Sequence, residues 1–445
     1  MCGFASDLSF PLTKNTIIMN RKNTWKSFGA ALALMLVLGT SCNSGNSNSG
    51  NSNSGNDKTD ALVEKPTEMT QEELEGLAEA LPKYNVVSNF HEGLAVVCNR
   101  ETDLYGFIDR KGNEVIPCQY RYISCDFNDG VAIVTKDNDQ EFIIDKTGKE
   151  IAKYDYGYHQ GFKEGLLAFG TTNEESGMDM EGYLDTNGKV VIAPTYEMGY
   201  CNGPFITDFS EGLCKRYDRE ANKSFFIDKT GKKVFECKGS AEDFHEGLAS
   251  VARDLSDKED EWKLRTGFID KKGAEVIPFI FNRTGQFCDG LCWAETDDAI
   301  GFINREGKFV ITGDYKTIVL EEGMECGESP LCPTFSEGLA WVSNKDGKFG
   351  YIDKTGKVVV PFRYEPWVED DMFLQGPCYN FHGGLARVWD KNTQKYGYID
   401  KTGKEVFPCR FDEAEDISEG IAVVGIDAHY GFIDAKGHCT LDMNK

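Results

Sequence analysis

Hallmarks of catalysis and metal binding are scarce in this sequence. Only six histidines occur, and none of the 15 cysteines stands in a Cys-x-x-Cys pair, which argues against a zinc site or a thioredoxin-like redox site. There is no Gly-x-Ser-x-Gly, no His-Glu-x-x-His and no phosphate-binding glycine-rich loop. The sequence therefore predicts no catalytic residue, no metal ligand and no cofactor, and the protein is not expected to be an enzyme.

Positive charge is scarce as well. The chain has 48 Lys and Arg against 73 Asp and Glu, a formal charge of −25. An acidic surface of this kind repels phosphate backbones, so nucleic acid is not an expected partner. It also disfavours direct binding to anionic lipid, so contact with a membrane is expected only through an N-terminal lipid.

A long apolar run is missing. The longest such run, residues 28–39, has twelve residues and would rise about 18 Å as a helix, well short of a bilayer core of ~30 Å. A short basic stretch from Met19 to Lys26 precedes it, and small residues follow it. This order is typical of a secretory signal, so residues 1–41 are predicted to be a signal region whose true start is Met19.

The segment after this run predicts a lipid anchor. Leu38-Gly39-Thr40-Ser41-Cys42 resembles a bacterial lipoprotein box, in which the cysteine is acylated, although Leu38 stands four rather than three positions before Cys42. The alternative is simple cleavage near Ser41. Residues 43–56 are Asn, Ser and Gly only, so residues 42–60 are expected to form a flexible tether. The expected location is the bacterial cell envelope, on its periplasmic face or at the cell surface.

A short helix is predicted within residues 61–85. Thr70 and Glu73 form a capping box, Leu74, Leu77, Ala78 and Leu81 fall on one face, and Pro82 ends the segment. A single amphipathic helix before a repeat array is expected to cap its first unit.

Residues 86–445 contain one recurring unit. Its first half reads aromatic-x-Glu/Asp-Gly-Leu-Ala-x-Val, and its second half reads aromatic-Gly-Phe/Tyr-Ile-Asp-Lys-x-Gly-Lys-x-Val-Ile-Pro. Nine copies, 35 to 48 residues apart, begin at Phe90, Phe127, Phe162, Phe209, Phe244, Phe287, Phe335, Phe381 and Ile417. Nine matches to a motif of this length indicate a repeat array.

Each unit predicts three strands, at residues 94–97, 106–109 and 114–117 in the first copy. An Asp opens the turn between the second and third strands, at Asp109, Asp353 and Asp400 for example, and a Gly closes it. An Asp carboxylate accepts bonds from backbone amides two residues on, and Gly adopts the left-handed conformation that the hairpin needs. These aspartates are therefore predicted to be structural.

The first predicted strand is apolar on both faces, so neighbouring repeats must cover it on either side. The fold class is thus all-β, a tandem array of about nine three-stranded β-meanders. Closed propellers usually have four to eight blades, so uneven spacing and nine copies favour an open superhelix or solenoid. The alternative is a closed, propeller-like toroid.

The paired signatures Glu-Gly-Leu-Ala-x-Val and Gly-Phe-Ile-Asp-Lys-x-Gly-Lys-x-Val-Ile-Pro resemble the bacterial WG (KWG) β-repeat family, from residue 90 to about 440. The family favours Trp before the Gly of the second strand. This chain departs from that preference with Tyr105, Phe349, Tyr396, Tyr430, Thr266 and Ile300. The resemblance implies no defined catalytic activity, and therefore a binding or scaffold role.

Insertions between and within repeats are the expected binding sites, because insertions in an array gather on one face. Trp262 stands among acidic residues, and Trp367 is followed by Phe373 and Tyr379. Exposed aromatics beside carboxylates suit sugar stacking or a protein contact, so these four are the candidate binding residues, and a protein or glycan of the envelope is the expected partner. The alternative for each is packing over a sheet edge.

Three further readings stay open. Carboxylates from two adjacent insertions would make a glycan-active hydrolase, the alternative function. The acidic loops at residues 137–139 and 254–261 lack calcium-site spacing and are expected to be solvated. Cys326 and Cys332 are the best candidates for a disulfide in an oxidising compartment.

Overall fold

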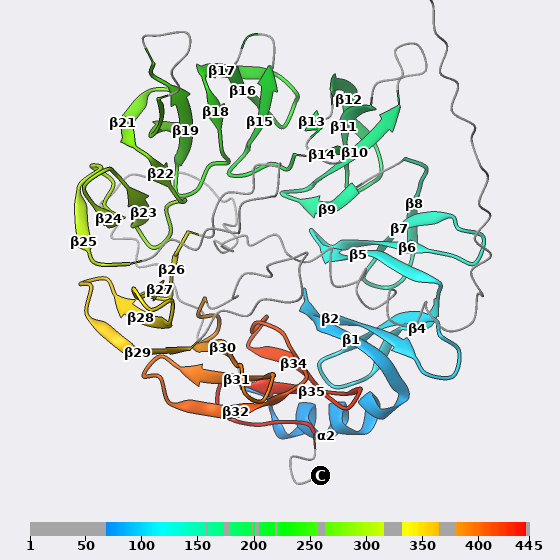
Figure 1. Cartoon of the computed structure of the whole chain (residues 1–445). Helices are drawn as coiled ribbons and strands as arrows, with labels where there is room; N and C mark the ends of the chain where they lie inside the picture. The colour runs from blue at the N-terminus through cyan, green and yellow to red at the C-terminus, as the bar shows by residue number, and fades with distance from the viewer. Residues whose placement is uncertain are drawn as a thin grey trace, which may run out of the picture. The chain divides into compact units, whose positions relative to one another are not determined.

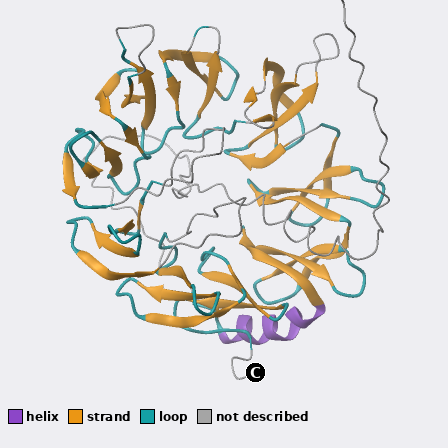
Figure 2. Ribbon diagram, viewed as in Figure 1, coloured by secondary structure: helices purple, strands orange, loops and turns teal. Residues whose placement is uncertain are grey.

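The structure is a computed structural model. It describes residues 68–156, 159–172, 179–197, 199–200, 204–205, 207–218, 221, 223–256, 263–315, 332–364 and 380–441. All of these belong to one compact unit, residues 42–445. Nine antiparallel sheets, the blades, follow one another along the described chain in a ring (Figure 1). Strands dominate them, and one helix lies at the edge (Figure 2).

The first three blades have four strands each. They are β1 (Tyr84–His91), β2 (Leu94–Asn99), β3 (Tyr105–Asp109) and β4 (Glu114–Tyr120) in blade 1; β5 (Tyr122–Asn128), β6 (Val131–Thr135), β7 (Glu141–Asp145) and β8 (Glu150–Tyr154) in blade 2; β9 (His159–Lys163), β10 (Leu166–Thr172), β11 (Asp179–Asp185) and β12 (Val190–Glu197) in blade 3. A two-stranded ribbon, β13 (Gly199–Tyr200) and β14 (Pro204–Phe205), follows.

Blades 4 to 6 continue the pattern. They are β15 (Leu213–Asp218), β16 (Lys223–Asp228) and β17 (Lys233–Lys238) in blade 4; β18 (Ser240–Ala241), β19 (Leu248–Asp254), β20 (Leu264–Asp270) and β21 (Glu275–Phe281) in blade 5; β22 (Arg283–Thr284), β23 (Cys292–Glu295), β24 (Ile300–Ile303) and β25 (Phe309–Thr312) in blade 6.

Blades 7 to 9 complete the described strands. They are β26 (Phe335–Ser336), β27 (Leu339–Ser343), β28 (Phe349–Asp353) and β29 (Val358–Tyr364) in blade 7; β30 (Leu385–Asp390), β31 (Lys395–Asp400) and β32 (Glu405–Phe411) in blade 8; β33 (Glu413–Ala414), β34 (Ile421–Ile426) and β35 (His429–Asp434) in blade 9.

Six of the nine described sheets have a fourth strand, which the sequence analysis missed. It precedes the three predicted strands and lies nearest the centre of the ring (Figure 1). In blade 1 it is β1, which pairs with β2 through His91 and Leu94. Elsewhere it is as short as two residues, too short for an alternating pattern to reveal.

The hydrophobic core is divided into nine clusters, one for each interface between neighbouring blades. Between blades 1 and 2, for example, Val96 and Phe107 of one blade pack with Phe127 and Val134 of the next. Each sheet is covered on both faces, as its two-sided apolar strands predicted. Burying a side chain of this kind stabilises by about 1.5–3 kcal/mol, and a single blade has no partner to bury against.

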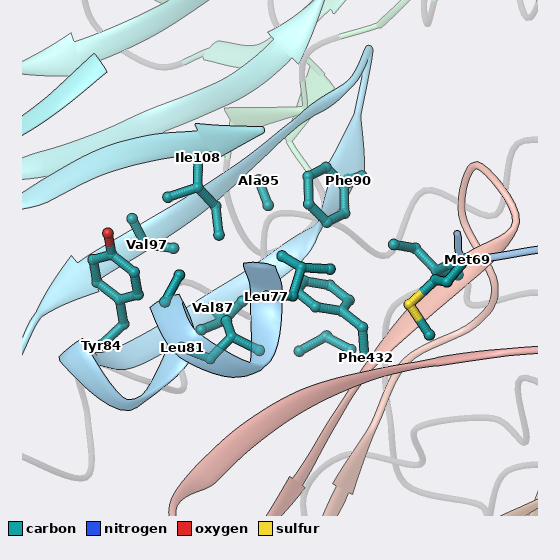
Figure 3. Close-up of a cluster of buried hydrophobic side chains, with 13 residues drawn as sticks. Met69, Leu77, Leu81, Tyr84, Val87, Phe90, Ala95, Val97, Ile108 and Phe432 are labelled. Atoms are coloured by element: carbon teal, nitrogen blue, oxygen red, sulfur yellow. The ribbon is translucent and has the colours of Figure 1, made fainter. Parts of the chain in front are cut away.

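The ninth cluster joins the last blade to the first. Phe90 of blade 1 packs against Phe432 of blade 9, with ring centroids 5.0 Å apart (Figure 3). Backbone and side-chain bonds cross the same interface: Asn89 Nδ2 donates to Asp416 O at 2.9 Å, and Ser418 Oγ donates to Phe90 O at 2.8 Å. The open superhelix expected from the sequence is therefore wrong, and its alternative, the closed propeller-like toroid, is confirmed. Closure packs blade 9 against blade 1, so the outward sheet surface of each end blade is covered.

Helix α2 (Gln71–Ala80) and the 3-10 turn η1 (Leu81–Lys83) reinforce this closure. Thr70 and Glu73 make the capping box, and Leu77 is fully buried in the ninth cluster. In the other blades the hairpin glycine packs on the outer strand of the preceding blade, as Gly148 does on Ile116. In blade 1, Gly112 packs instead on Gly76 and Ala80 of α2, so the helix replaces an outer strand of blade 9.

Candidate functional site

The two ends of the ring are built differently. The turn at Glu92–Gly93 and the hairpin at Asp109–Gly112 lie at the same end of blade 1, because Leu94 pairs with Asp109. We call this end of the ring the turn face and the opposite end the loop face. The turn face is regular, whereas every longer insertion begins at a strand end on the loop face.

Acidic side chains on the turn face bind the next blade. Glu92 accepts a bond from Gly130 N at 3.0 Å, and Lys146 of that blade donates to Glu92 O at 3.0 Å. Seven further interfaces have the same acid-to-glycine bond: Asp129 to Gly165, Glu164 to Gly212, Glu211 to Gly247, Glu246 to Gly290, Asp289 to Gly338, Glu337 to Gly384 and Glu419 to Gly93.

These eight acids adopt a left-handed backbone conformation, with φ between 50° and 55°. Such a conformation is unfavourable for a residue with a Cβ, and the bond to the next blade offsets the strain. In the interface between blades 8 and 9, Gly383 takes the acid's place with φ 56°. The repeated acids therefore connect neighbouring blades through hydrogen bonds.

The hairpin aspartates bind their own turn. Asp353 Oδ1 accepts bonds from Thr355 N at 2.9 Å and Lys357 N at 3.0 Å. Asp109 and Asp400 each accept the amides two and four residues on in the same way. The hydrogen bonds to Thr355 also hold the pKa of Asp353 below its usual value, although burial opposes them. A carboxylate held in this way is poorly placed for acid–base chemistry.

The position that holds the family's Trp, four residues before the hairpin Asp, is polar in blades 2 to 5. These blades have Glu141, Glu181, Ser224 and Thr266 there. Two of the four are glutamates at interfaces between blades, where an unpaired charge would be costly.

Glu181 is fully buried and makes an ion pair with Arg216 of the next blade, which is 7% exposed. Tyr183 Oη donates to Glu181 Oε1 at 2.8 Å, and Thr207 N donates to the same oxygen at 3.0 Å. The guanidinium lies 5.3 Å from the ring centroid of Tyr183 and 4.8 Å from that of Tyr196. Burial alone would lower the pKa of Arg216, but Tyr183 and Glu181 raise it. The pair joins blades 3 and 4 and has no counterpart at the same position elsewhere in the repeats.

Glu141 lies in a similar cluster between blades 2 and 3. Ser124 Oγ and Thr135 Oγ1 donate to it, and His159 Nε2 lies 3.9 Å from Glu141 Oε1. Burial raises the pKa of Glu141, but the bonds to His159 and Ser124 outweigh it and leave the pKa below its usual value. Ser124 contacts the carboxylate and not the imidazole, so this is not the arrangement of a Ser-His nucleophile.

Two carboxyls, that of Asp126 in β5 and that of Asp208 just before Phe209, have a raised pKa. Burial raises the pKa of Asp126 to about 6, although His91 opposes the shift. Burial likewise raises the pKa of Asp208 to about 6, against the opposing charge of Lys163. Both precede the aromatic residue that opens their repeat. Within the described residues, no group of three or more His, Cys, Asp or Glu side chains is arranged to hold a metal ion.

The candidate binding residues from the sequence, Trp262, Trp367, Phe373 and Tyr379, lie outside the described residues, as does Cys42. Cys326 lies outside them too. The ten described cysteines form no disulfide with one another. Of the acidic loops, Asp139 pairs with Arg121, and Asp254 Oδ1 accepts Ser256 N and Lys263 N at 2.9 Å each.

The strand ends from which the insertions leave nevertheless lie at one end of the molecule. Thr172 and Asp179 flank the first, and Asp254 and Lys263 flank a second, both between the second and third strands of their blades. The others, at residues 197–208, 313–334 and 366–380, connect an outer strand to the next blade. Because strand direction alternates, both kinds of insertion begin on the loop face, and those between blades lead to inner-strand residues nearer the turn face, such as Phe335 and His382.

Sequence reasoning missed Glu141, the buried Glu181 and Arg216. Aligning the nine copies on the hairpin Asp would have revealed them, because Glu141 and Glu181 then stand where Tyr105 and Tyr396 stand in other copies. Arg216 falls at a position that is apolar in the other eight copies. A charge at such a position predicts a partner in the neighbouring blade.

The nine blades and their closure define the protein as a nine-bladed β-propeller. The family model of the WG containing repeat matches residues 81–101, 105–138, 182–215, 267–298, 349–365 and 396–428. These six segments of the chain therefore match the WG-containing repeat. That model describes a repeat and not a catalytic domain, and no curated protein matches the chain.

Several solved structures are similar to parts of this chain. A crystal structure of a eukaryotic initiation factor is similar over 75% of this chain and 92% of that chain, with 10% identity and a TM-score of 0.50. BamB from Moraxella catarrhalis (10% identity, 72% and 91% covered) and AztD from Citrobacter koseri (9%, 78% and 90%) both have a TM-score of 0.32. At 10% identity, the likeness to the initiation factor concerns the fold alone. Among the described residues, no helix has the length and apolar character needed to cross a membrane.

Proposed function

We propose that this propeller is a non-enzymatic binding or scaffold protein, anchored to the bacterial cell envelope through Cys42, whose loop face engages a protein or a glycan. One observation carries the proposal: every longer insertion begins at a strand end on the loop face. The turn face, by contrast, is made of short turns whose acids bind backbone amides. Variable loops on a rigid scaffold are the usual place for recognition.

Trp262 and Trp367 are the proposed contact residues, since both fall in these insertions beside acidic residues. Aromatic rings of this kind supply a large share of the binding energy where they meet a sugar ring or a protein pocket. The mature chain with Cys42→Ser should retain proteins or glycans of the envelope in a pull-down on arrays. Trp262→Ala or Trp367→Ala should weaken retention by about tenfold or more.

Thr147→Ala on the turn face serves as a control, because it removes an exposed side chain far from the insertions. Retention that survives both tryptophan changes would remove the loop-face proposal. Release of reducing sugar from envelope polysaccharide by the purified protein would replace a binding role with a hydrolase. Incorporation of a fatty-acid analogue tests the anchor separately, and unchanged labelling of Cys42→Ser would exclude it.

A further inference from the structure

We infer that the turn face lies against an anionic lipid bilayer and holds the loop face away from it. The inference rests on the anchored state proposed above and adds an orientation to it. Two independent observations support it: where the N-terminal segment joins the ring, and how charge is distributed over the two faces.

The chain joins the ring on the turn face. Glu68 pairs with Lys436 at 2.8 Å, and Met69 N donates to Asp434 Oδ2 at 2.9 Å. Asp434 opens the hairpin of blade 9, which belongs to the turn face. Helix α2 then runs toward the loop face, where Arg100 N donates to Lys83 O at 3.0 Å. A lipid on Cys42 would therefore be linked to the ring at the turn face, whatever path residues 43–67 take.

The turn face also carries a ring of exposed lysines. Seven of the nine hairpins have two or three basic residues within five positions after the Asp or Asn that opens them. The first basic residue commonly pairs with the preceding blade, as Lys146 does with Glu92. The lysine at the fourth position is exposed and makes no ion pair with another described residue. Six blades have it: Lys149, Lys189, Lys232, Lys308, Lys357 and Lys404.

Many acids of the same face are held close to the backbone, whereas others, such as Glu306 and Glu405, are exposed. The hairpin aspartates accept amides of their own turn, and the turn glutamates accept a glycine amide of the next blade. A lysine side chain extends further from the backbone than these short or hydrogen-bonded acidic side chains. Lysine ammonium groups would therefore be the first charges to contact a flat membrane surface. Attraction between such lysines and anionic lipid is significant within a Debye length of about 8–10 Å.

The loop face has a different charge distribution. The connection between β6 and β7 carries Asp137 and Asp139, and that between β23 and β24 carries Asp297 and Asp298, whereas the connection between β27 and β28 carries Lys345 and Lys348. The net charge of −25 led the sequence analysis to expect no electrostatic attraction to lipid, but that expectation treats the charge as evenly spread. With the lysines on one face and these acids on the other, an anionic bilayer favours one orientation.

Energy transfer to a labelled bilayer measures this orientation. The mature chain, with an N-terminal decahistidine tag, is held on bilayers containing a nickel-chelating lipid, so that anchoring does not depend on acylation. A donor dye replaces either Glu306 on the turn face or Asp298 on the loop face of the same blade. Both are exposed acids, so the two labels change the charge equally.

On a bilayer with about one third phosphatidylglycerol, transfer from position 306 should exceed transfer from position 298 by about twofold. Replacing the six lysines with Gln should bring the difference down to the value on phosphatidylcholine, as should high salt. Thermal melts verify that this variant is folded, and Lys308→Gln with Lys357→Gln and Lys404→Gln provides a half-ring variant that should lose part of the difference.

Equal transfer from the two positions on the anionic bilayer, or greater transfer from position 298, would overturn the orientation. A difference unaffected by the lysine changes would overturn the electrostatic part. Because the tag replaces the lipid, a failure of Cys42 acylation would leave this result standing, and a failure here would leave the anchor and the loop-face binding proposals intact.

Discussion

Replacing Gly76 with alanine tests whether α2 holds the ends of the ring together. Gly76 lies in the helix against the hairpin of blade 1, and a Cβ added there would lie 2.1 Å from Lys111 O and 3.0 Å from Lys111 C. The obstacle is backbone and cannot rotate away. In an isolated helix the same change would be favourable by about 1 kcal/mol, because alanine is the better helix former.

The expected outcome is a net loss of stability. To admit the methyl group, α2 must move away from the hairpin, which weakens the burial of Leu77 and the bond from Arg110 Nε to Glu73 Oε1 at 2.7 Å. Overpacking of this kind costs about 1–3 kcal/mol, and full exposure of a leucine costs a similar amount. After the gain in helix propensity, the free energy of unfolding should fall by about 1–3 kcal/mol.

Urea unfolding followed by tryptophan fluorescence gives this difference, and limited proteolysis reports whether the N-terminal segment is released first. Ala78→Gly is the matched control, since Ala78 is exposed on the same helix. It should lose about 1 kcal/mol through helix propensity without exposing the seam between blades 9 and 1. If Gly76→Ala proves as stable as the unmodified protein or more so, the helix does not hold the ring closed.

Three further changes probe other parts of the ring. Glu181→Gln or Arg216→Met should each lower the free energy of unfolding by about 3–5 kcal/mol. The double variant Glu181→Tyr with Arg216→Val, which has the residue types of other blades, should recover most of this loss. Additive losses in the double-mutant cycle would exclude coupling between the two residues. The raised pKa values of Asp126 and Asp208, about 6 each, make the folded state bind more protons than the unfolded chain between about pH 4 and 6. Stability should therefore rise by about 1 kcal/mol per carboxyl between pH 7.5 and pH 5, and melting temperatures of the Asn variants should lack this rise. Glu337→Ala removes the acceptor of a glycine amide and of a lysine, and should lower the free energy of unfolding by about 1–2 kcal/mol in urea; no change would mean that the turn-face bonds add nothing.

Much of each blade was predictable from local rules. The helix begins at the capping box of Thr70 and Glu73, and the chain turns at each hairpin where an Asp and a Gly supply the geometry that a hairpin needs. Strands such as β2 and β3 lie where the apolar motif placed them. These features depend on residues within a few positions of one another, and one copy of the repeat suffices to infer them.

Closure was not predictable in the same way. It depends on the small angle between successive sheets, accumulated over nine blades, and no single repeat encodes that angle. Some inner strands were missed because they have only two residues, as Ser240–Ala241 does. The longer β1 and β5 were missed because register shifts interrupt the alternation of buried and exposed residues. The buried pair of Glu181 and Arg216 was missed because each residue taken alone looks like an exposed charge, and only the packing of one blade on the next brings the two together.

The use of α2 as the neighbour of blade 1 has a consequence for how the molecule forms. The amide of Met69 and the carboxylate of Asp434, which meet at this seam, are 365 residues apart. Contacts between distant parts of a chain form slowly. Blades can stack as the polypeptide emerges, but the final seam must wait for the C-terminal residues. A chain truncated before blade 9 would therefore leave Leu77 and Phe90 uncovered, and an unfinished molecule would differ from a finished one by an exposed apolar edge.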